Sequence, residues 1–310
     1  MESLNRTATD LVDEAIDFAD ELNVAVHQLD SEALVLDFGV DAPGGIEAGL
    51  MLAEIQTAGL ATVQSRMDDV GGAPLAHVEL STDQPALALL CAQKAGWEVS
   101  AESFEGLGSG PARALVATEE EFQRIGYRDD FEFAVLAVES DELPGEAVVE
   151  HVAETAGVAE SGVFLAAFSA ASLTGSTAIA SRTAELAAFR LSELGYDPLD
   201  VRSVSGVAPV APVVGDEETA IARTNDALAY GGRAHVVVDE PFDRFADVPS
   251  TATEQYGRPF ADIFADADWD FYEVDESVFA PAEVTIDVVG GDTHVFGEVN
   301  EDLLVESFGL

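Results

Sequence analysis

The chain has 310 residues, 60 of them acidic and 13 basic, so its formal net charge is −47. A nucleic-acid-binding protein needs a basic surface to replace the counterions on phosphates, and a basic membrane-binding surface needs the same excess, so this composition excludes both. The hydrophobic fraction of 48% is large enough for a folded core. Lys94 is the only lysine, and carboxylates are spread along the whole chain. This pattern favours a folded protein in the cytosol of a salt-accumulating halophile, where molar salt screens repulsion to within about 3 Å.

The sequence shows no sign of export or membrane insertion. Residues 1–5 lack the basic start and apolar core of a signal peptide, and the longest uncharged stretch, residues 161–181, is too polar for a membrane span. We therefore expect a cytoplasmic protein. Cys91 is the single cysteine, which excludes an internal disulfide, and its apolar neighbours indicate a buried thiol.

Hydrophobic spacing and turn residues predict a mixture of helices and strands along the chain. The expected helices cover residues 4–22, 44–55, 81–96, 141–156, 174–194 and 216–230. The expected strands cover residues 24–27, 33–38, 61–66, 76–80, 98–101, 132–138, 162–168, 199–204 and 233–238, with a closing hairpin of residues 284–289 and 293–296. Residues 106–111 are expected to form a glycine-rich loop, and residues 240–281 loops with a short helix. The elements do not alternate strictly, which favours an α+β fold; we expect two domains, residues 1–143 and 144–310.

Several common catalytic signatures are missing. The five histidines show no HExxH spacing, and no cysteine cluster can accompany them, so no metal site is predicted. The sequence also lacks the GxSxG of serine hydrolases, the GxxxxGK[ST] of phosphate-binding loops and a strand-linked GxGxxG.

The segment from Gly106 to Arg113 is a candidate binding loop. Glycines at alternate positions, Gly106, Gly108 and Gly110, allow backbone N–H groups to converge on an anion or a flat ligand. Arg113 can add a bidentate donor. A tight turn without ligand is an equally good interpretation of the spacing.

Two further segments gather arginines in a chain that otherwise avoids positive charge. Arg182 and Glu185 are three residues apart, so they share one face of a helix. A surface ion pair explains them, but the uncharged and apolar flanks indicate that the pair is partly buried, where Arg182 would hold Glu185 ionised and in place. In residues 222–233, Arg223 lies with polar side chains before a double glycine and Arg233 follows that double glycine. Such arginines suit anion recognition or carboxylate positioning.

Four segments together, in this order, resemble the archaeal methenyltetrahydromethanopterin cyclohydrolases. They are residues 43–49 (PGGIEAG), 108–115 (GSGPARAL), 175–185 (GSTAIASRTAE) and 223–232 (RTNDALAYGG). The resemblance covers nearly the whole chain. It implies two α+β domains with an active-site cleft between them, a homo-oligomer that is a trimer, a pterin as substrate, and no metal or redox cofactor.

The resemblance also implies the roles of individual residues. Glu185 would be the general base and acid, and Arg182 would position it. The substrate-binding residues would be Gly108, Ser109, Gly110, Arg113, Arg223, Asn225, Asp226 and Tyr230. The implied reaction is the reversible hydrolysis of N5,N10-methenyl-tetrahydromethanopterin to the N5-formyl compound. Two alternatives stay open: the same reaction on methenyl-tetrahydrofolate, and a pterin-binding protein without activity.

Overall fold

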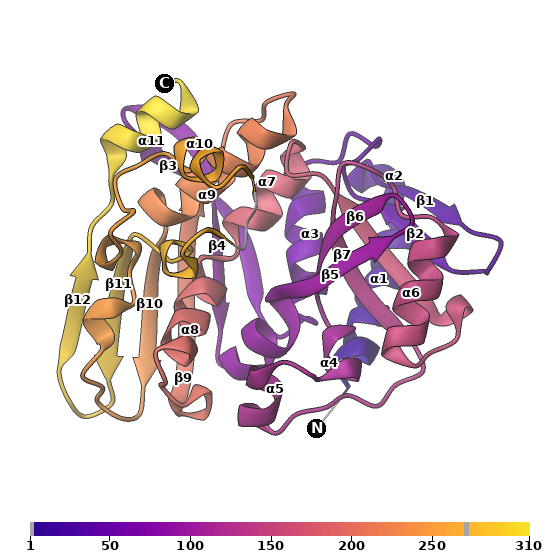
Figure 1. Ribbon diagram of the computed structural model, residues 1–310, viewed down its shortest axis with the longest axis horizontal. Coiled ribbons are helices and arrows are strands. Elements are labelled where there is room, and N and C mark those ends of the chain that lie inside the picture. Colours follow the sequence, from indigo (N-terminus) through magenta and orange to yellow (C-terminus); the bar gives the residue numbers. More distant parts are fainter. Residues whose placement is uncertain (1–2, 270–272) are drawn as a thin grey trace. The chain divides into compact units, whose positions relative to one another are not determined.

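The computed structural model describes residues 3–269 and 273–310, which form two compact units. The first unit comprises Met1–Thr62 and Ala86–Ala178, and the second comprises Val63–Pro85 and Ile179–Leu310. Each unit has its own six-stranded sheet (Figure 1). The combination of mixed sheets with helices confirms the α+β class.

The first unit has the sheet order β1-β2-β8-β7-β6-β5. Strands β2, β8 and β7 are parallel, and the other pairings are antiparallel. The strands are β1 (Ala25–Gln28), β2 (Leu34–Asp37), β5 (Ala95–Ala101), β6 (Phe104–Ser109), β7 (Ala134–Glu139) and β8 (Val163–Phe168). The helices are α1 (Leu4–Asp17), α2 (Ala19–Leu22), α3 (Ile46–Gln56), η1 (Ala86–Gln93), α4 (Arg113–Val116), α5 (Glu120–Ile125), α6 (Glu146–Ala156), η2 (Glu160–Gly162) and α7 (Leu173–Ala180).

Helices cover both faces of this first sheet. Ala134, Leu136 and Val138 of β7 lie in the same core as the apolar face of α6. The alternate side chains Val135 and Ala137 are equally buried, and α1 and α3 pack on β7 and on each other. A strand that is buried on both faces has a continuous run of apolar residues, and residues 134–138 form such a run.

The second unit has the sheet order β12-β11-β10-β9-β4-β3. Strands β10 and β11 are parallel, while β4–β9, β9–β10 and β11–β12 are antiparallel. The strands are β3 (Thr62–Val70), β4 (Ala73–Thr82), β9 (Val201–Pro209), β10 (Arg233–Val238), β11 (Glu283–Val288) and β12 (Thr293–Gly297). The helices are α8 (Thr183–Glu193), η3 (Pro198–Asp200), α9 (Glu217–Gly231), η4 (Phe245–Asp247), η5 (Ser250–Ala252), α10 (Phe260–Asp266), η7 (Glu276–Val278) and α11 (Glu301–Phe308).

Most expected elements are present, and three expectations need correction. The helix expected over residues 174–194 is two helices, α7 and α8, because the chain turns at Ser181 and Arg182. Of the glycine-rich segment expected as a loop, residues 106–109 belong to strand β6, and Gly110 and Pro111 follow the strand. The helix expected over residues 81–96 is shorter and wide, of the π type, over Ala86–Gln93. Helices α4, α5 and α11 were not expected. Residues 270–272 of the expected 240–281 loops lie outside the described residues.

The expected domain boundary at residues 143/144 falls inside the first unit. It separates β7 from β8, which pair in parallel from Ala134↔Val163 to Glu139↔Phe168. The described units instead divide near residues 62, 85 and 178, so β3 and β4 join the second sheet although they precede much of the first in sequence.

Two smaller expectations concern Cys91 and the membrane. Cys91 is fully buried in η1, as expected, and burial raises the pKa of its thiol to about 12. Over the residues that the structure describes, no helix combines the length and the apolar character needed to cross a membrane.

Candidate active site

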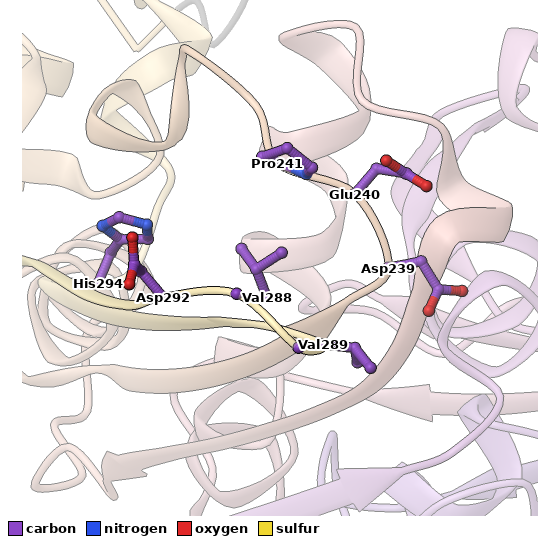
Figure 2. Close-up of a pocket in the computed structure, with 9 residues that line it drawn as sticks. Asp239, Glu240, Pro241, Val288, Val289, Asp292 and His294 are labelled. Atoms are coloured by element: carbon purple, nitrogen blue, oxygen red, sulfur yellow. The ribbon is translucent and has the colours of Figure 1, made fainter.

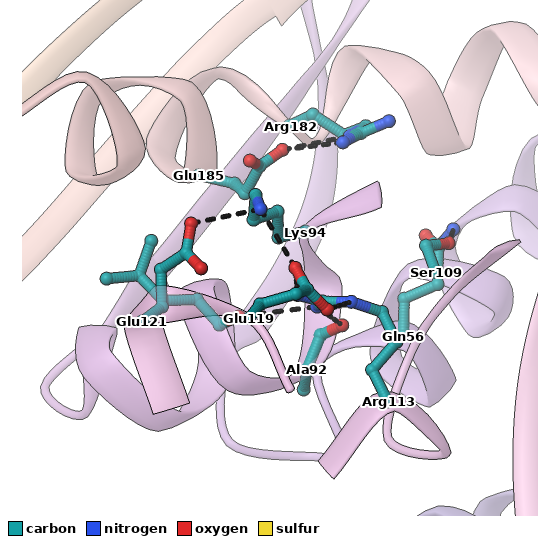
Figure 3. A network of polar contacts seen from close by, with 10 residues as sticks. Gln56, Ala92, Lys94, Ser109, Arg113, Glu119, Glu121, Arg182 and Glu185 are labelled. Atoms are coloured by element: carbon teal, nitrogen blue, oxygen red, sulfur yellow. Dashed lines mark hydrogen bonds and ion pairs between the residues drawn. The ribbon is translucent and has the colours of Figure 1, made fainter. Parts of the chain in front are cut away.

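Arg182 and Glu185 form a buried ion pair in the second unit (Figure 3). The Arg182 Nε donates to Glu185 Oε2 at 3.0 Å, and Nη2 donates to the same oxygen at 2.8 Å. The Glu185 side chain is 1% exposed and that of Arg182 is 17% exposed. A charge-assisted pair with one partner removed from water is held in one geometry, unlike a solvated surface pair. The expected partial burial of this pair is therefore confirmed.

The break between α7 and α8 places the two side chains. The backbone N–H of Arg182 closes a turn on the carbonyl of Ile179, and Arg182 then stands at the N-cap of α8. Glu185 lies in the first turn of that helix, where the helix dipole favours a negative charge. Both hydrogen bonds from Arg182 end on Oε2, so the arginine does not engage Oε1.

Two glycines make room for this first turn. A Cβ on Gly206 of β9 would lie 2.4 Å from the backbone nitrogen of Ala184, and a Cβ on Gly232 would lie 3.2 Å from Cγ2 of Thr183. Any side chain at Gly206 would push the turn that carries Glu185 off the sheet. Gly232 is the last residue of the RTNDALAYGG segment, so part of that motif serves the packing around the pair. Gly206 was not singled out from the sequence, although a glycine inside a strand is a known sign of close backbone approach.

The PGGIEAG and GSTAIAS motifs pack against each other in the first unit. A Cβ on Gly49 of α3 would lie 2.5 Å from Cβ of Thr177, so α3 and α7 are in close contact there. Gly44 has a φ of +56°, and a Cβ on it would lie 2.0 Å from the hydroxyl oxygen of Thr174. That oxygen accepts a hydrogen bond from the backbone N–H of Gly45 at 2.9 Å. These glycines therefore permit a close helix contact just ahead of the turn that bears Arg182.

The expected binding residues of the GSGPARAL segment are mostly buried in the first unit. Gly108 pairs with Trp97 across β5 and β6, and a Cβ on it would lie 3.0 Å from the Trp97 carbonyl oxygen. Ser109 is buried and accepts a hydrogen bond from Gln56 Nε2 at 2.9 Å. Gly110 has a φ of +109°, a conformation that suits glycine. Because Gly106 and Gly108 lie in strand β6, their N–H groups do not converge on one point as those of a loop cradle would.

Arg113 is buried and hydrogen-bonded on three sides (Figure 3). Its Nε and Nη2 donate to the two carboxylate oxygens of Glu119 at 2.9 and 2.6 Å, and Nη1 donates to the carbonyl oxygens of Leu90 and Ala92. Lys94 adds ion pairs to Glu119 at 2.9 Å and to Glu121 at 3.0 Å. Burial by itself would raise the pKa of Glu119, but Arg113 and Lys94 hold it below its ordinary value. In this arrangement Arg113 recognises a carboxylate of its own chain.

The four candidate residues of α9 are placed differently from one another. Asn225 donates from Nδ2 to the carbonyl of Ile221 one turn earlier, and Arg223 lies near Gly309 at the end of α11. Asp226 is buried and accepts from the backbone N–H of Phe260 and from the Ser307 hydroxyl. Tyr230 is fully buried in an aromatic cluster, donates its hydroxyl to the carbonyl of Arg258, and has its pKa raised by burial. Substrate binding by these four residues stays a prediction.

A surface pocket of about 350 Å³ lies elsewhere in the second unit (Figure 2). It is lined by residues after β10 and around the β11–β12 turn, including Asp239, Asp292 and His294. Gly232, which contacts the first turn of α8, precedes β10, so this pocket and the Arg182–Glu185 pair lie at opposite ends of that strand. Within residues 3–269 and 273–310, no three His, Cys, Asp or Glu side chains are grouped so that they could hold a metal ion.

Comparison with known proteins assigns a class to this arrangement. The model of the cyclohydrolase family MCH matches residues 3–308, and the chain therefore belongs to that family of hydrolytic enzymes. Over its full length it is 60% identical to the whole methenyltetrahydromethanopterin cyclohydrolase of Halobacterium salinarum. The enzyme of that name from Methanospirillum hungatei shares 40% identity with the chain, in an alignment that covers the whole chain and 99% of that enzyme. The one from Methanothermobacter thermautotrophicus shares 41% identity over the full length of both proteins.

Proposed function

We propose that this chain catalyses the reversible hydrolysis of N5,N10-methenyl-tetrahydromethanopterin to N5-formyl-tetrahydromethanopterin. The observation that carries the proposal is full-length membership of the cyclohydrolase family together with a buried arginine–glutamate pair. The names of the relatives favour the methanopterin carrier. They favour neither the folate carrier nor a binding protein without activity.

The first step is the addition of water to the methenyl carbon, which is electrophilic because it belongs to a cationic amidinium. Glu185 accepts a proton from the water as the new C–O bond forms, which gives a neutral hydroxyl adduct. We assign this task to Oε1, since Arg182 binds Oε2. Before the step, the carboxylate also stabilises the cationic ring electrostatically.

The second step breaks the C–N10 bond. Glu185 returns its proton to N10, the electrons of the C–N10 bond go to that nitrogen, and the adduct hydroxyl becomes the formyl carbonyl as its proton leaves for solvent. In total, the cation and one water give the neutral formyl compound and one proton. Arg182 is a positioning residue in this scheme, because it fixes the carboxylate orientation in both steps.

The proposal includes no redox cofactor and no metal, because the carbon has the same oxidation level in the methenyl and formyl compounds and the carboxylate supplies the proton transfer. It also includes a homo-oligomer, a trimer by the family resemblance, and a cytoplasmic location, since a chain with a net charge of −47 suits a compartment at molar salt.

The test is loss of the methenyl chromophore in molar potassium chloride, with the methanopterin and folate carriers assayed separately. We expect turnover with the methanopterin carrier and a rate about 10²–10⁴-fold lower for Glu185→Gln, the usual contribution of a general base. Glu193→Gln is the matched control, because Glu193 lies on the same helix and is also paired to an arginine three residues away. Full activity of Glu185→Gln would refute the mechanism. Loss no faster than background with both carriers would refute the proposed function.

A further inference from the structure

Asp226 joins three helices of the second unit. It lies on α9, on which both α10 and α11 pack (Figure 1). Its Oδ1 accepts from the backbone N–H of Phe260, the first residue of α10, at 2.9 Å. Its Oδ2 accepts from the Ser307 hydroxyl of α11 at 2.6 Å. Because each oxygen is bound by a different helix, the carboxylate fixes α9 in relation to both of them.

Helix α11 is fastened to α9 at further points. The backbone N–H of Asn300, the N-cap of α11, donates to the Tyr230 carbonyl near the end of α9 at 2.9 Å. A Cβ on Gly231 would lie 3.0 Å from Cδ1 of Leu304, so the two helices are in close contact there. The Ser307 hydroxyl adds a contact near the other end of α11. Helix α11 therefore holds α9 at both of its own ends.

The end of α9 lies against the turn that carries Glu185. The backbone N–H of Gly232 donates to the Leu228 carbonyl at 2.9 Å, which ties Gly232 to α9. A Cβ on Gly232 would lie 3.2 Å from Cγ2 of Thr183, the first residue of α8. Glu185 lies in the same first turn of α8. Since close-packed neighbours transmit displacements, a shift of α9 reaches this turn.

The carboxyl group of Asp226 is costly at this buried position. Its side chain is 2% exposed, and burial disfavours the ionised form and raises the pKa of Asp226. The charge of Asp262 on α10 acts in the same direction, while Arg223 on α9 and the two hydrogen bonds act against it. Apolar packing could join the three helices without this cost, but it is not directional. The specific contribution of the carboxylate is therefore a fixed orientation of α9.

We propose that Asp226 is a positioning residue for Glu185, because it holds α9 to α10 and α11 and so keeps Gly232 against the first turn of α8. The proposal rests on the task of Glu185 in the proposed function. It gives Asp226 no contact with the substrate, since both of its oxygens bind other groups of the second unit. When Asp226 loses these partners, the hydrogen bonds between Arg182 and Glu185 should loosen.

The kinetic test compares Asp226→Ala with Asp226→Asn at pH 7.5 in molar potassium chloride. Alanine loses both hydrogen bonds, whereas asparagine can accept from the Phe260 N–H and donate to the Ser307 hydroxyl oxygen. With methenyl-tetrahydromethanopterin, we expect kcat of the alanine variant to fall about tenfold and KM to change by less than about twofold, because only the placement of the base is lost. Asparagine should restore at least about half of the wild-type kcat.

Nitrogen-15 NMR of the arginine side chains gives a second readout that does not depend on turnover. The chain has 13 basic residues and one of them is a lysine, so few arginine signals overlap. The Arg182 Nε–H signal is the one that Arg182→Lys lacks, and its hydrogen bond to Glu185 slows its exchange with water. We expect this exchange to be roughly tenfold faster in Asp226→Ala and close to the wild-type rate in Asp226→Asn.

Ser307→Ala removes only the α11 contact, so it decides the matter if circular dichroism shows that Asp226→Ala has not folded. We expect it to change kcat and the Arg182 exchange in the same direction, by a smaller factor. Ser3→Ala is the matched control, because the Ser3 hydroxyl donates to the buried Asp129 carboxylate at 2.9 Å in the first unit. It should leave both readouts unchanged.

Three results overturn the proposal: both readouts unchanged in the folded alanine variants, an equal effect of Ser3→Ala, or no recovery with asparagine. A wild-type chain without turnover refutes the proposed function instead. In that case the Arg182 exchange still decides whether Asp226 positions the Arg182–Glu185 pair.

Discussion

Asp226 gives the sharpest quantitative prediction. It is 2% exposed and accepts two hydrogen bonds, from the Phe260 backbone at 2.9 Å and from the Ser307 hydroxyl at 2.6 Å. Burial raises its pKa from the ordinary 3.8 to about 6, although both hydrogen bonds and Arg223 act in the opposite direction. The folded protein therefore binds a proton at Asp226 more tightly than the unfolded chain does.

The sign of the pH dependence follows from this difference. A raised pKa in the folded state contributes stability below the unfolded pKa, and that contribution is lost as pH rises through about 6. Between pH 7.5 and pH 4.5, proton binding at Asp226 should add about 2 kcal/mol to the free energy of unfolding. Asp226→Asn removes the titration and keeps the size of the side chain, so its stability relative to wild type should fall by about the same amount over this range.

Urea unfolding followed by circular dichroism in molar potassium chloride, at both pH values, measures the effect. Asp13→Asn, at an exposed position of α1, corrects for the loss of one carboxylate and should show no comparable change with pH. If the difference between Asp226→Asn and wild type is the same at pH 4.5 and 7.5, burial does not disfavour the ionised form of Asp226 and the reasoning fails.

Two further predictions concern the packing around the two ion-pair groups. Gly206→Ala should lower turnover at least tenfold while the fold persists, because its Cβ would lie 2.4 Å from the Ala184 nitrogen and displace the turn of Glu185. Gly215→Ala is the control, since its Cβ would meet nothing within 4 Å, and it should leave turnover unchanged. Equal rates in the two variants would count against the packing argument. Arg113→Ala should destabilise the protein by about 3–5 kcal/mol in urea unfolding, because it leaves the buried carbonyls of Leu90 and Ala92 without their donor and leaves Glu119 paired with Lys94 alone. A loss below about 1 kcal/mol would show that Arg113 is not structural.

Local patterns predicted the secondary structure well because short-range rules govern it. The β10 strand begins and ends where alternation and the Gly231-Gly232 pair indicate, and α9 begins at a capped Asp216. The break between α7 and α8 was missed because residues 174–194 have continuous helical spacing. That break follows shortly after the point between Ala178 and Ile179 at which the chain passes from one compact unit to the other, and this passage depends on tertiary contacts.

Residues of one motif can serve different purposes, and sequence alone did not separate them. Arg113, Asp226 and Tyr230 lie in the most family-specific segments, yet each is buried with partners inside its own unit. The glycines of β6 looked like an anion cradle, but they permit close strand packing. The resemblance pointed to segments of the chain, and the surroundings of each side chain decide whether it faces a ligand or the core.

The sequence by itself determined the acidic surface, the α+β class and the Arg182–Glu185 pair, because composition, hydrophobic period and i,i+3 spacing are local properties. The cyclohydrolase family followed from the resemblance of four motifs. Only the tertiary structure decided that β3 and β4 join the second sheet, that Gly206 admits the turn bearing Glu185, and that Asp226 joins three helices. Each of these depends on contacts between residues distant in the chain, and no local spacing encodes which distant surface a side chain will meet.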